Sequence, residues 1–133
     1  MTKRLLFFVP PSLYMGLIFC LSSRPAPEFF QGWPLYWGMK SVHLCEYGFL
    51  ALLWIVALLR GTTLPLRDAY ALSVVVTFLW GVSDEWHQAF VPGRSARLED
   101  VLTDLSAALL CVAGCAIIRW PRRPGQTAPS KLG

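Results

Sequence analysis

The sequence predicts an all-α integral membrane protein, a bundle of four transmembrane helices. Of its 133 residues, 55% are hydrophobic and only 15% are charged, whereas an ordinary soluble domain carries about 25% charged residues. The apolar residues form long blocks, and a chain of this length, which corresponds to one domain, has no core large enough to bury them. We therefore expect lipid around these blocks. The predicted transmembrane domain spans residues 1–120, and residues 121–133, which lack apolar periodicity, are expected to be a disordered cytoplasmic tail.

The first predicted helix covers residues 5–22, where Pro10 and Pro11 should kink it, as helices in membranes tolerate. Lys3 and Arg4 precede this block as they would precede the apolar region of a signal peptide. No small-residue cleavage pattern surrounds Cys20, however, so a retained helix is favoured over a cleaved signal.

Three further blocks, residues 39–59, 69–90 and 98–119, each have the roughly 20 mostly apolar residues that a spanning helix needs. The segment between the first two helices is rich in proline, glycine and aromatic residues. It predicts a loop in the membrane interface, with these side chains at headgroup level: Trp33, Tyr36 and Trp37. The four cysteines lie inside apolar blocks without a CxxC pair, which favours small packing residues over a disulfide framework or a zinc site.

The basic residues predict the direction of the helices. Of the 12 Lys and Arg residues, eight fall on one side, namely Lys3, Arg4, Arg60, Arg67, Arg119, Arg122, Arg123 and Lys131. The other four are Arg24, Lys40, Arg94 and Arg97. By the positive-inside rule both termini should be cytoplasmic. The loop that holds "VPGR" then faces outward. A net charge of +4 is explained by this distribution, so no nucleic-acid partner is expected.

Polar residues from three predicted helices should meet in one layer below the outer surface. With a rise of ~1.5 Å per residue, they lie within roughly 10 Å of that surface. Helical spacing places Lys40, His43 and Tyr47 on one stripe, and Asp100 with Asp104 on another. Ionised side chains in hydrocarbon cost several kcal/mol, so they normally face the bundle interior and have partners. The segment "GVSDEWHQAFVPGR" therefore predicts one wall of a polar pocket. The predicted ligand-binding residues are Lys40, His43, Glu46, Tyr47, Asp84, Gln88, Arg94, Asp100 and Asp104.

Two simpler interpretations stay open. Glu85 and Arg97 could be solvated residues of the interface, and Asp84 with Asp104 could be a structural polar clamp between helices.

The segments "KSVHLCEYGFLALL" and "SDEWHQAFVPGRSARLEDVLTDLSAAL" resemble the VanZ-like family of small bacterial membrane proteins. The resemblance implies these motif positions: Lys40, His43, Tyr47, Ser83, Asp84, Glu85, Gln88, Phe90, Pro92, Gly93, Arg94 and Asp100. Met39 and Asp104 depart from the pattern, which has aspartate and asparagine there. The resemblance implies a multi-pass protein of the bacterial plasma (inner) membrane with a cell-envelope role connected with resistance to teicoplanin. It does not give a reaction.

The first functional hypothesis is recognition of an envelope molecule at the outer leaflet. Membrane lipids are the expected surroundings, and a lipid-linked envelope precursor or a lipoglycopeptide is the expected ligand. Arg94 could bind a phosphate or carboxylate bidentately. Pro92 and Gly93 suit a type II turn that would aim its side chain.

The second hypothesis is a membrane-embedded hydrolase or transferase that acts on a lipid phosphate or ester. The candidate catalytic residues are Asp84, Glu85 and His43, and Asp84 is spaced from His87 as an acid–base pair could be. In this hypothesis a metal ion could be bound by four side chains: His43, Glu46, Asp84 and His87. The prediction is no metal and no cofactor, and catalysis is disfavoured because no HExxH, GxSxG or P-loop motif is present.

The remaining hypotheses are a structural or partner-binding role and transport. Transport is disfavoured because we expect the inner half of each helix to be apolar, with no polar residues to continue a path. The sequence does not predict the oligomeric state.

Overall fold

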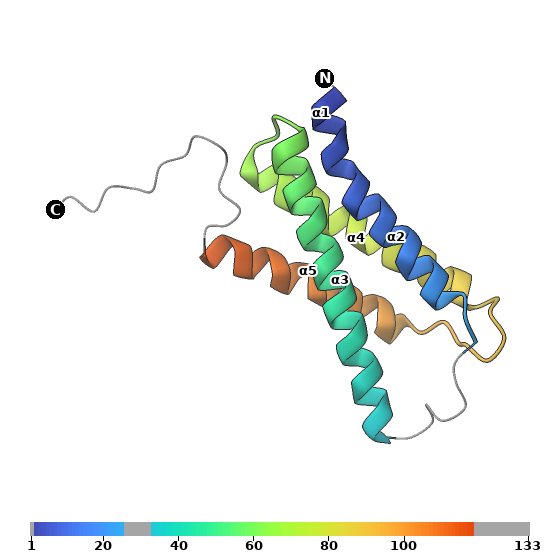
Figure 1. Ribbon diagram of the computed structural model, residues 1–133. Coiled ribbons are helices and arrows are strands. Elements are labelled where there is room, and N and C mark those ends of the chain that lie inside the picture. The colour runs from blue at the N-terminus through green and yellow to red at the C-terminus, as the bar shows by residue number, and fades with distance from the viewer. Residues whose placement is uncertain (1, 26–32, 119–133) are drawn as a thin grey trace.

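The computed structural model describes residues 2–25 and 33–118, and all regular secondary structure in these ranges is helical (Figure 1). The elements are α1 (Thr2–Leu5), the 3-10 turn η1 (Leu6–Phe8), α2 (Val9–Ser22), α3 (Trp33–Gly61), α4 (Leu66–Gln88) and α5 (Leu98–Ile117). The all-α prediction is thereby confirmed. The predicted disordered tail lies outside the described residues.

The first helical region runs from α1 through η1 into α2 and begins earlier than predicted. Pro10 and Pro11 occupy the first positions of α2, where a missing N–H does least harm. Because Pro10 has no N–H to offer, the carbonyl of Leu6 accepts from the backbone N–H of Val9 instead. The two prolines therefore produce a short 3-10 turn at Leu6–Phe8 ahead of α2.

The largest departure from the sequence-based boundaries is the start of α3. It begins at Trp33, so residues 33–38, which were predicted to lie in an interfacial loop, are helical. Pro34 is the second residue of the helix, a position that tolerates proline. A helix of 29 residues is ~43 Å long, more than the ~30 Å hydrocarbon core of a bilayer.

Three helices are long and apolar enough to cross a membrane, over Lys40–Gly61, Leu66–Gln88 and Leu98–Ile117. A shorter apolar helix covers Leu6–Ser22. The chain is therefore a multi-pass membrane protein.

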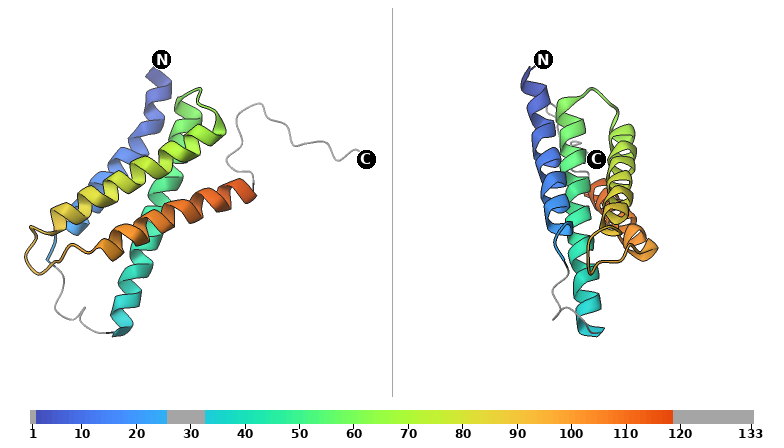
Figure 2. Two further views of the ribbon diagram at one scale, coloured as in Figure 1. Left: turned by 180° about the vertical axis from the view of Figure 1, so that it is seen from behind. Right: turned by 90° about the vertical axis from the view of Figure 1, so that its right-hand side faces the viewer.

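Helix α3 lies at the centre of the bundle and contacts each of the other helices. In the side view, α2 lies on one side of it and α4 and α5 lie on the other (Figure 2). The turn between α3 and α4 lies at the same end as the N-terminus, while α2 and α4 finish, and α5 begins, at the opposite end (Figures 1 and 2). We call this second end the Ser22/Gln88 end, after the last residues of α2 and α4.

Two apolar clusters fill the bundle. One lies toward the N-terminal end and includes Ile55, Leu58 and Cys115. The other includes Ile18 and Leu50 and borders the polar residues described below.

The packing interpretation of the cysteines is correct for part of them. Cys115 is buried in the first cluster and Cys111 packs against it. Cys20 and Cys45 instead lie on the exposed surface of the bundle, and all four are free thiols.

Candidate functional site

The buried face of α4 is polar, whereas its exposed face is apolar. The buried residues are Ala69, Ser73, Thr77, Gly81, Asp84, Glu85 and Gln88. The large exposed apolar residues are Leu66, Leu72, Val75, Leu79, Val82 and Trp86. Such a helix is inverted with respect to a soluble protein, as expected when the surroundings are lipid. The expectation that the inner halves of the helices lack polar residues is wrong for α4, because helical spacing places Ser73 and Thr77 on the same face as Asp84.

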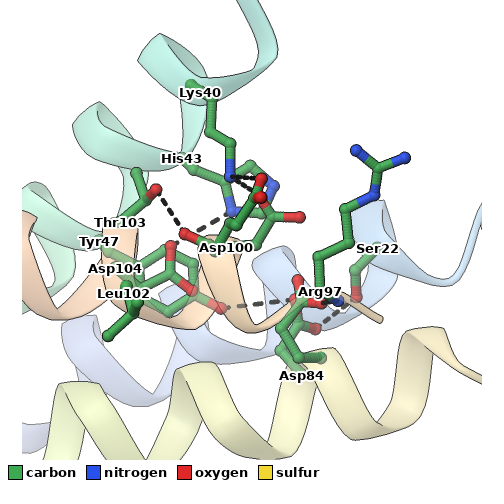
Figure 3. Close-up of polar contacts among 12 residues, drawn as sticks. Ser22, Lys40, His43, Tyr47, Asp84, Arg97, Asp100, Leu102, Thr103 and Asp104 are labelled. Atoms are coloured by element: carbon green, nitrogen blue, oxygen red, sulfur yellow. Dashed lines mark hydrogen bonds and ion pairs between the residues drawn. The ribbon is translucent and has the colours of Figure 1, made fainter. Parts of the chain in front are cut away.

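Asp84 accepts hydrogen bonds from three helices and is 3% exposed. The hydroxyl of Ser22 donates to its Oδ1 at 2.5 Å (Figure 3). Its Oδ2 accepts from Gln88 Nε2 at 2.8 Å and from the hydroxyl of Tyr47 at 3.4 Å. The carboxylate therefore joins the ends of α2 and α4 to the middle of α3.

Two polar pairs connect α3 to α5 one turn above Tyr47. Lys40 pairs with Asp100, and His43 Nδ1 lies 3.2 Å from Asp104 Oδ1 (Figure 3). The spacing of three residues on α3 matches the spacing of four on α5, so successive turns of the two helices face each other. Asp104 is 1% exposed, and its Oδ2 has no hydrogen-bond partner among the described residues.

Gly81 permits the close contact between Asp104 and α4. A Cβ at this position would lie 3.0 Å from Asp104 Oδ2 and 3.3 Å from Tyr47 Cε1. Any larger residue would therefore push α5 or Tyr47 away from α4. Gly81 was absent from the sequence-based site, since a glycine in a helix has no side chain that would indicate a functional role.

Glu85 fixes the start of α5. Its Oε2 accepts the backbone N–H of Arg97 at 2.9 Å, and its Oε1 lies 3.4 Å from Gln88 Nε2. Arg97 is the N-cap residue of α5. Glu85 is 4% exposed, so its interpretation as a solvated interfacial residue is wrong, whereas the Arg97 side chain is exposed, as that interpretation requires. Because both of its oxygens accept hydrogen bonds from the protein, Glu85 is better suited to hold the start of α5 in place than to act as a catalytic residue.

Arg94 binds the C-terminal end of α2. Its Nε donates to the carbonyl of Arg24 at 3.0 Å, its Nη2 to that of Leu21 at 3.5 Å, and its Nη1 to Gln88 Oε1 at 3.3 Å. Gly93 has a positive φ of 77° and follows Pro92 in a turn closed by Arg94 N–H to Val91 O at 3.1 Å, as the predicted type II turn requires. The bound anion that the sequence suggested for Arg94 did not anticipate these carbonyl partners.

His87 faces α2 and not the carboxylate of Asp84. Its Nε2 lies 3.0 Å from Ser23 Oγ, and its ring is 4.4 Å from the ring of Phe19. The Ser23 hydroxyl also lies 2.6 Å from the Phe19 carbonyl, and the imidazole tautomer decides whether Ser23 or His87 donates in their contact. The predicted acid–base pair of Asp84 and His87 therefore has no direct contact.

Glu46 is half-buried and has no hydrogen-bond partner within the two described ranges. No group of three or more His, Cys, Asp or Glu side chains in these ranges is arranged to hold a metal ion.

Sequence reasoning placed the carboxylates correctly in one layer but omitted Ser22 and Ser23 from the site. Their position at the end of the first apolar block, level with the polar end of α4, was the available signal.

Comparison with curated proteins and with solved structures gives no match to this chain. The VanZ/LLP1 family does match, over residues 4–119, which include every helix that contributes to the polar cluster. The chain is a member of the VanZ/LLP1 family.

Proposed function

We propose that this protein recognises the polar part of an envelope molecule at the outer surface of a bacterial plasma membrane. In this proposal both termini are cytoplasmic and the Ser22/Gln88 end faces outward. The observation that carries it is the convergence of polar side chains from α2, α3, α4 and α5 on Asp84 and Asp104, which are 3% and 1% exposed. Buried ionisable residues within membrane spans are expensive and generally mark functional sites.

The proposed ligand is a lipid-linked precursor or a lipoglycopeptide, and the proposed consequence is a contribution to teicoplanin-type resistance. Membership of the VanZ/LLP1 family supports the envelope role. The exposed cationic side chains of Arg24 and Arg97 lie at the same end and would favour an anionic membrane surface. No nucleic-acid or protein partner enters this proposal.

A second candidate is a hydrolase or transferase that acts on a lipid phosphate or ester, and one contact favours it. Asp104 holds Nδ1 of His43, and no described residue hydrogen-bonds to Nε2 of that ring. A carboxylate bound to one imidazole nitrogen orients the other as a general base. His43 is then the catalytic candidate, in preference to Glu85 or Asp84, whose oxygens are engaged by protein donors.

Asp84→Asn tests a site against a structural clamp. The amide keeps the size of the side chain and part of its hydrogen bonding but removes the charge. We expect teicoplanin tolerance conferred by the protein to fall about tenfold or more, as for loss of 1.4 kcal/mol of binding, at unchanged levels of folded protein. The matched control is Asp68→Asn, which alters an exposed carboxylate in the first turn of the same helix. Loss of folded protein in parallel with tolerance would support the clamp, and unchanged tolerance would refute the proposal.

A further inference from the structure

The cations of the polar cluster are already engaged by the protein. Lys40 pairs with Asp100 and lies 4.0 Å from Glu99. The guanidinium of Arg94 donates one N–H from each of its three nitrogens, to Gln88 Oε1 and to the carbonyls of Leu21 and Arg24. His43 directs Nδ1 at Asp104. An incoming phosphate or carboxylate would have to displace Asp100 from Lys40, or use the two remaining N–H groups of Arg94.

Two carboxylates of the cluster have oxygens without a hydrogen-bond partner in the described part of the chain. Asp104 Oδ2 is buried without a described partner, and it faces α4 at Gly81, one turn below Asp84. The carboxylate of Glu46 is half-buried and also lacks a hydrogen bond within the described part of the chain. Both oxygens would be satisfied by a donor, and a buried acceptor left unpaired costs about 1–3 kcal/mol.

The balance of charge agrees with this. The buried and half-buried carboxylates of the Ser22/Gln88 end are Glu46, Asp84, Glu85, Asp100 and Asp104. The permanently cationic side chains that are half-buried at this end are Lys40 and Arg94. The remaining titratable groups there include the imidazoles of His43 and His87 and the phenol of Tyr47. Carboxylates therefore outnumber cations, and a cationic ligand group would reduce the excess negative charge.

We infer that the ligand group recognised by this cluster is a protonated primary amine. This inference rests on the proposed function and names the chemistry of its ligand. An ammonium has three N–H donors and no acceptor, which complements Asp104 and Glu46. The anionic group that the sequence suggested for Arg94 is not required, because that side chain caps α2.

The amine could come from a soluble molecule or from an aminophospholipid headgroup. Probes that share a dodecyl chain but differ in the polar head group test for recognition of the amine itself. The full-length protein is placed in phosphatidylcholine nanodiscs and titrated with dodecylammonium, dodecyltrimethylammonium and dodecyl phosphate. Saturable binding is followed through tryptophan fluorescence, since the partly buried Trp54 and Trp80 pack against the cluster that contains Tyr47.

We expect dodecylammonium to bind and the trimethylated cation, which has no N–H, to bind at least tenfold more weakly. Glu46→Gln and Asp104→Asn should each weaken dodecylammonium binding at least tenfold, with Asp68→Asn as the unchanged control. The two site variants come from different helices, so a folding defect in one leaves the other as a test.

Competition then distinguishes the sources. Displacement of the probe by free ethanolamine indicates a soluble amine, and displacement by phosphatidylethanolamine in the nanodisc indicates a lipid; displacement by neither refutes the inference. Equal binding by the site variants also refutes it. Tight binding of dodecyl phosphate alone refutes the amine but preserves the proposed function, whereas full teicoplanin tolerance in Asp84→Asn removes the proposed function itself.

Discussion

The two ends of α3 are held in place by different forces. Toward the N-terminal end, Ile55 and Leu58 pack among apolar side chains of α4 and α5. Toward the other end, Lys40 and His43 bind carboxylates of α5, and Tyr47 binds Asp84 of α4. Lipid is as apolar as leucine, so the first end gains from close packing alone. The second end has specific partners, and only there does the chemistry of each side chain determine the arrangement.

Small residues are needed at both ends, but for different reasons: a Cβ on Gly61 would meet the ring of Phe8 and, at 3.1 Å, the carbonyl of Arg4, whereas one on Gly81 would meet polar partners. Hydrogen bonds require distances near 3 Å, whereas apolar packing tolerates adjustment by flexible side chains. Gly81 lies where α3, α4 and α5 meet around Asp104. A Cβ added to Gly114, on α5, would instead have no atom of a neighbouring element within 4 Å, so this glycine is under no such constraint.

Gly81→Val should have the largest effect on folding. The new side chain would meet Asp104 and Tyr47, and overpacking of this kind costs about 1–3 kcal/mol. Gly114→Val is the matched control, since it introduces the same residue into a helix at an open position. Thermal unfolding in detergent measures both. Equal losses of stability in the two variants would show that helix propensity, and not the contact at Gly81, governs the result.

Arg94→Lys should have an intermediate effect. A lysine ammonium cannot reach the carbonyls of Leu21 and Arg24 and the amide oxygen of Gln88 with the planar geometry of a guanidinium. We expect a loss of about 1–2 kcal/mol, the equivalent of one or two hydrogen bonds. Backbone amide exchange should rise at the end of α2.

Arg97→Lys is the control for Arg94→Lys because its guanidinium is exposed and donates to Ser95. If Arg94→Lys weakens binding of an anionic ligand while exchange at the end of α2 stays as in the native protein, the capping role assigned to Arg94 is wrong.

The general architecture was accessible from sequence because its signals are local. Apolar blocks predict helices, and spacings of three and four residues place Lys40 and His43, or Asp100 and Asp104, on common faces. The pairing of His43 with Asp104 follows from two such faces at one depth.

The partners of Asp84 and Arg94 were not accessible in this way. Ser22 and the carbonyls of α2 reach them from residues 62 to 73 positions away in the sequence. No local pattern encodes such a contact, since it depends on the angle at which α2 meets α4. The start of α3 was missed for a different reason, because Pro34 was interpreted as a loop residue although proline is also compatible with a first helical turn.

Thr77→Val should have the smallest effect on stability and gives the most direct information on how far the polar site extends. Thr77 is completely buried on the same face of α4 as Asp84, and its Oγ1 has no hydrogen-bond partner among the described residues. Valine has nearly the same shape, so loss of an unpaired hydroxyl should leave stability unchanged or raise it by up to about 1 kcal/mol. Ser73→Ala is the comparison, because the Ser73 hydroxyl already donates to the carbonyl of Tyr70 at 2.7 Å and is therefore satisfied within α4. Unfolding and teicoplanin tolerance would be measured for both variants. Normal tolerance in Thr77→Val would confine the site to the level of Asp104 and above. Reduced tolerance with unchanged stability would extend it one helical turn toward the N-terminal end, into the half of the bundle where apolar packing otherwise holds the helices together.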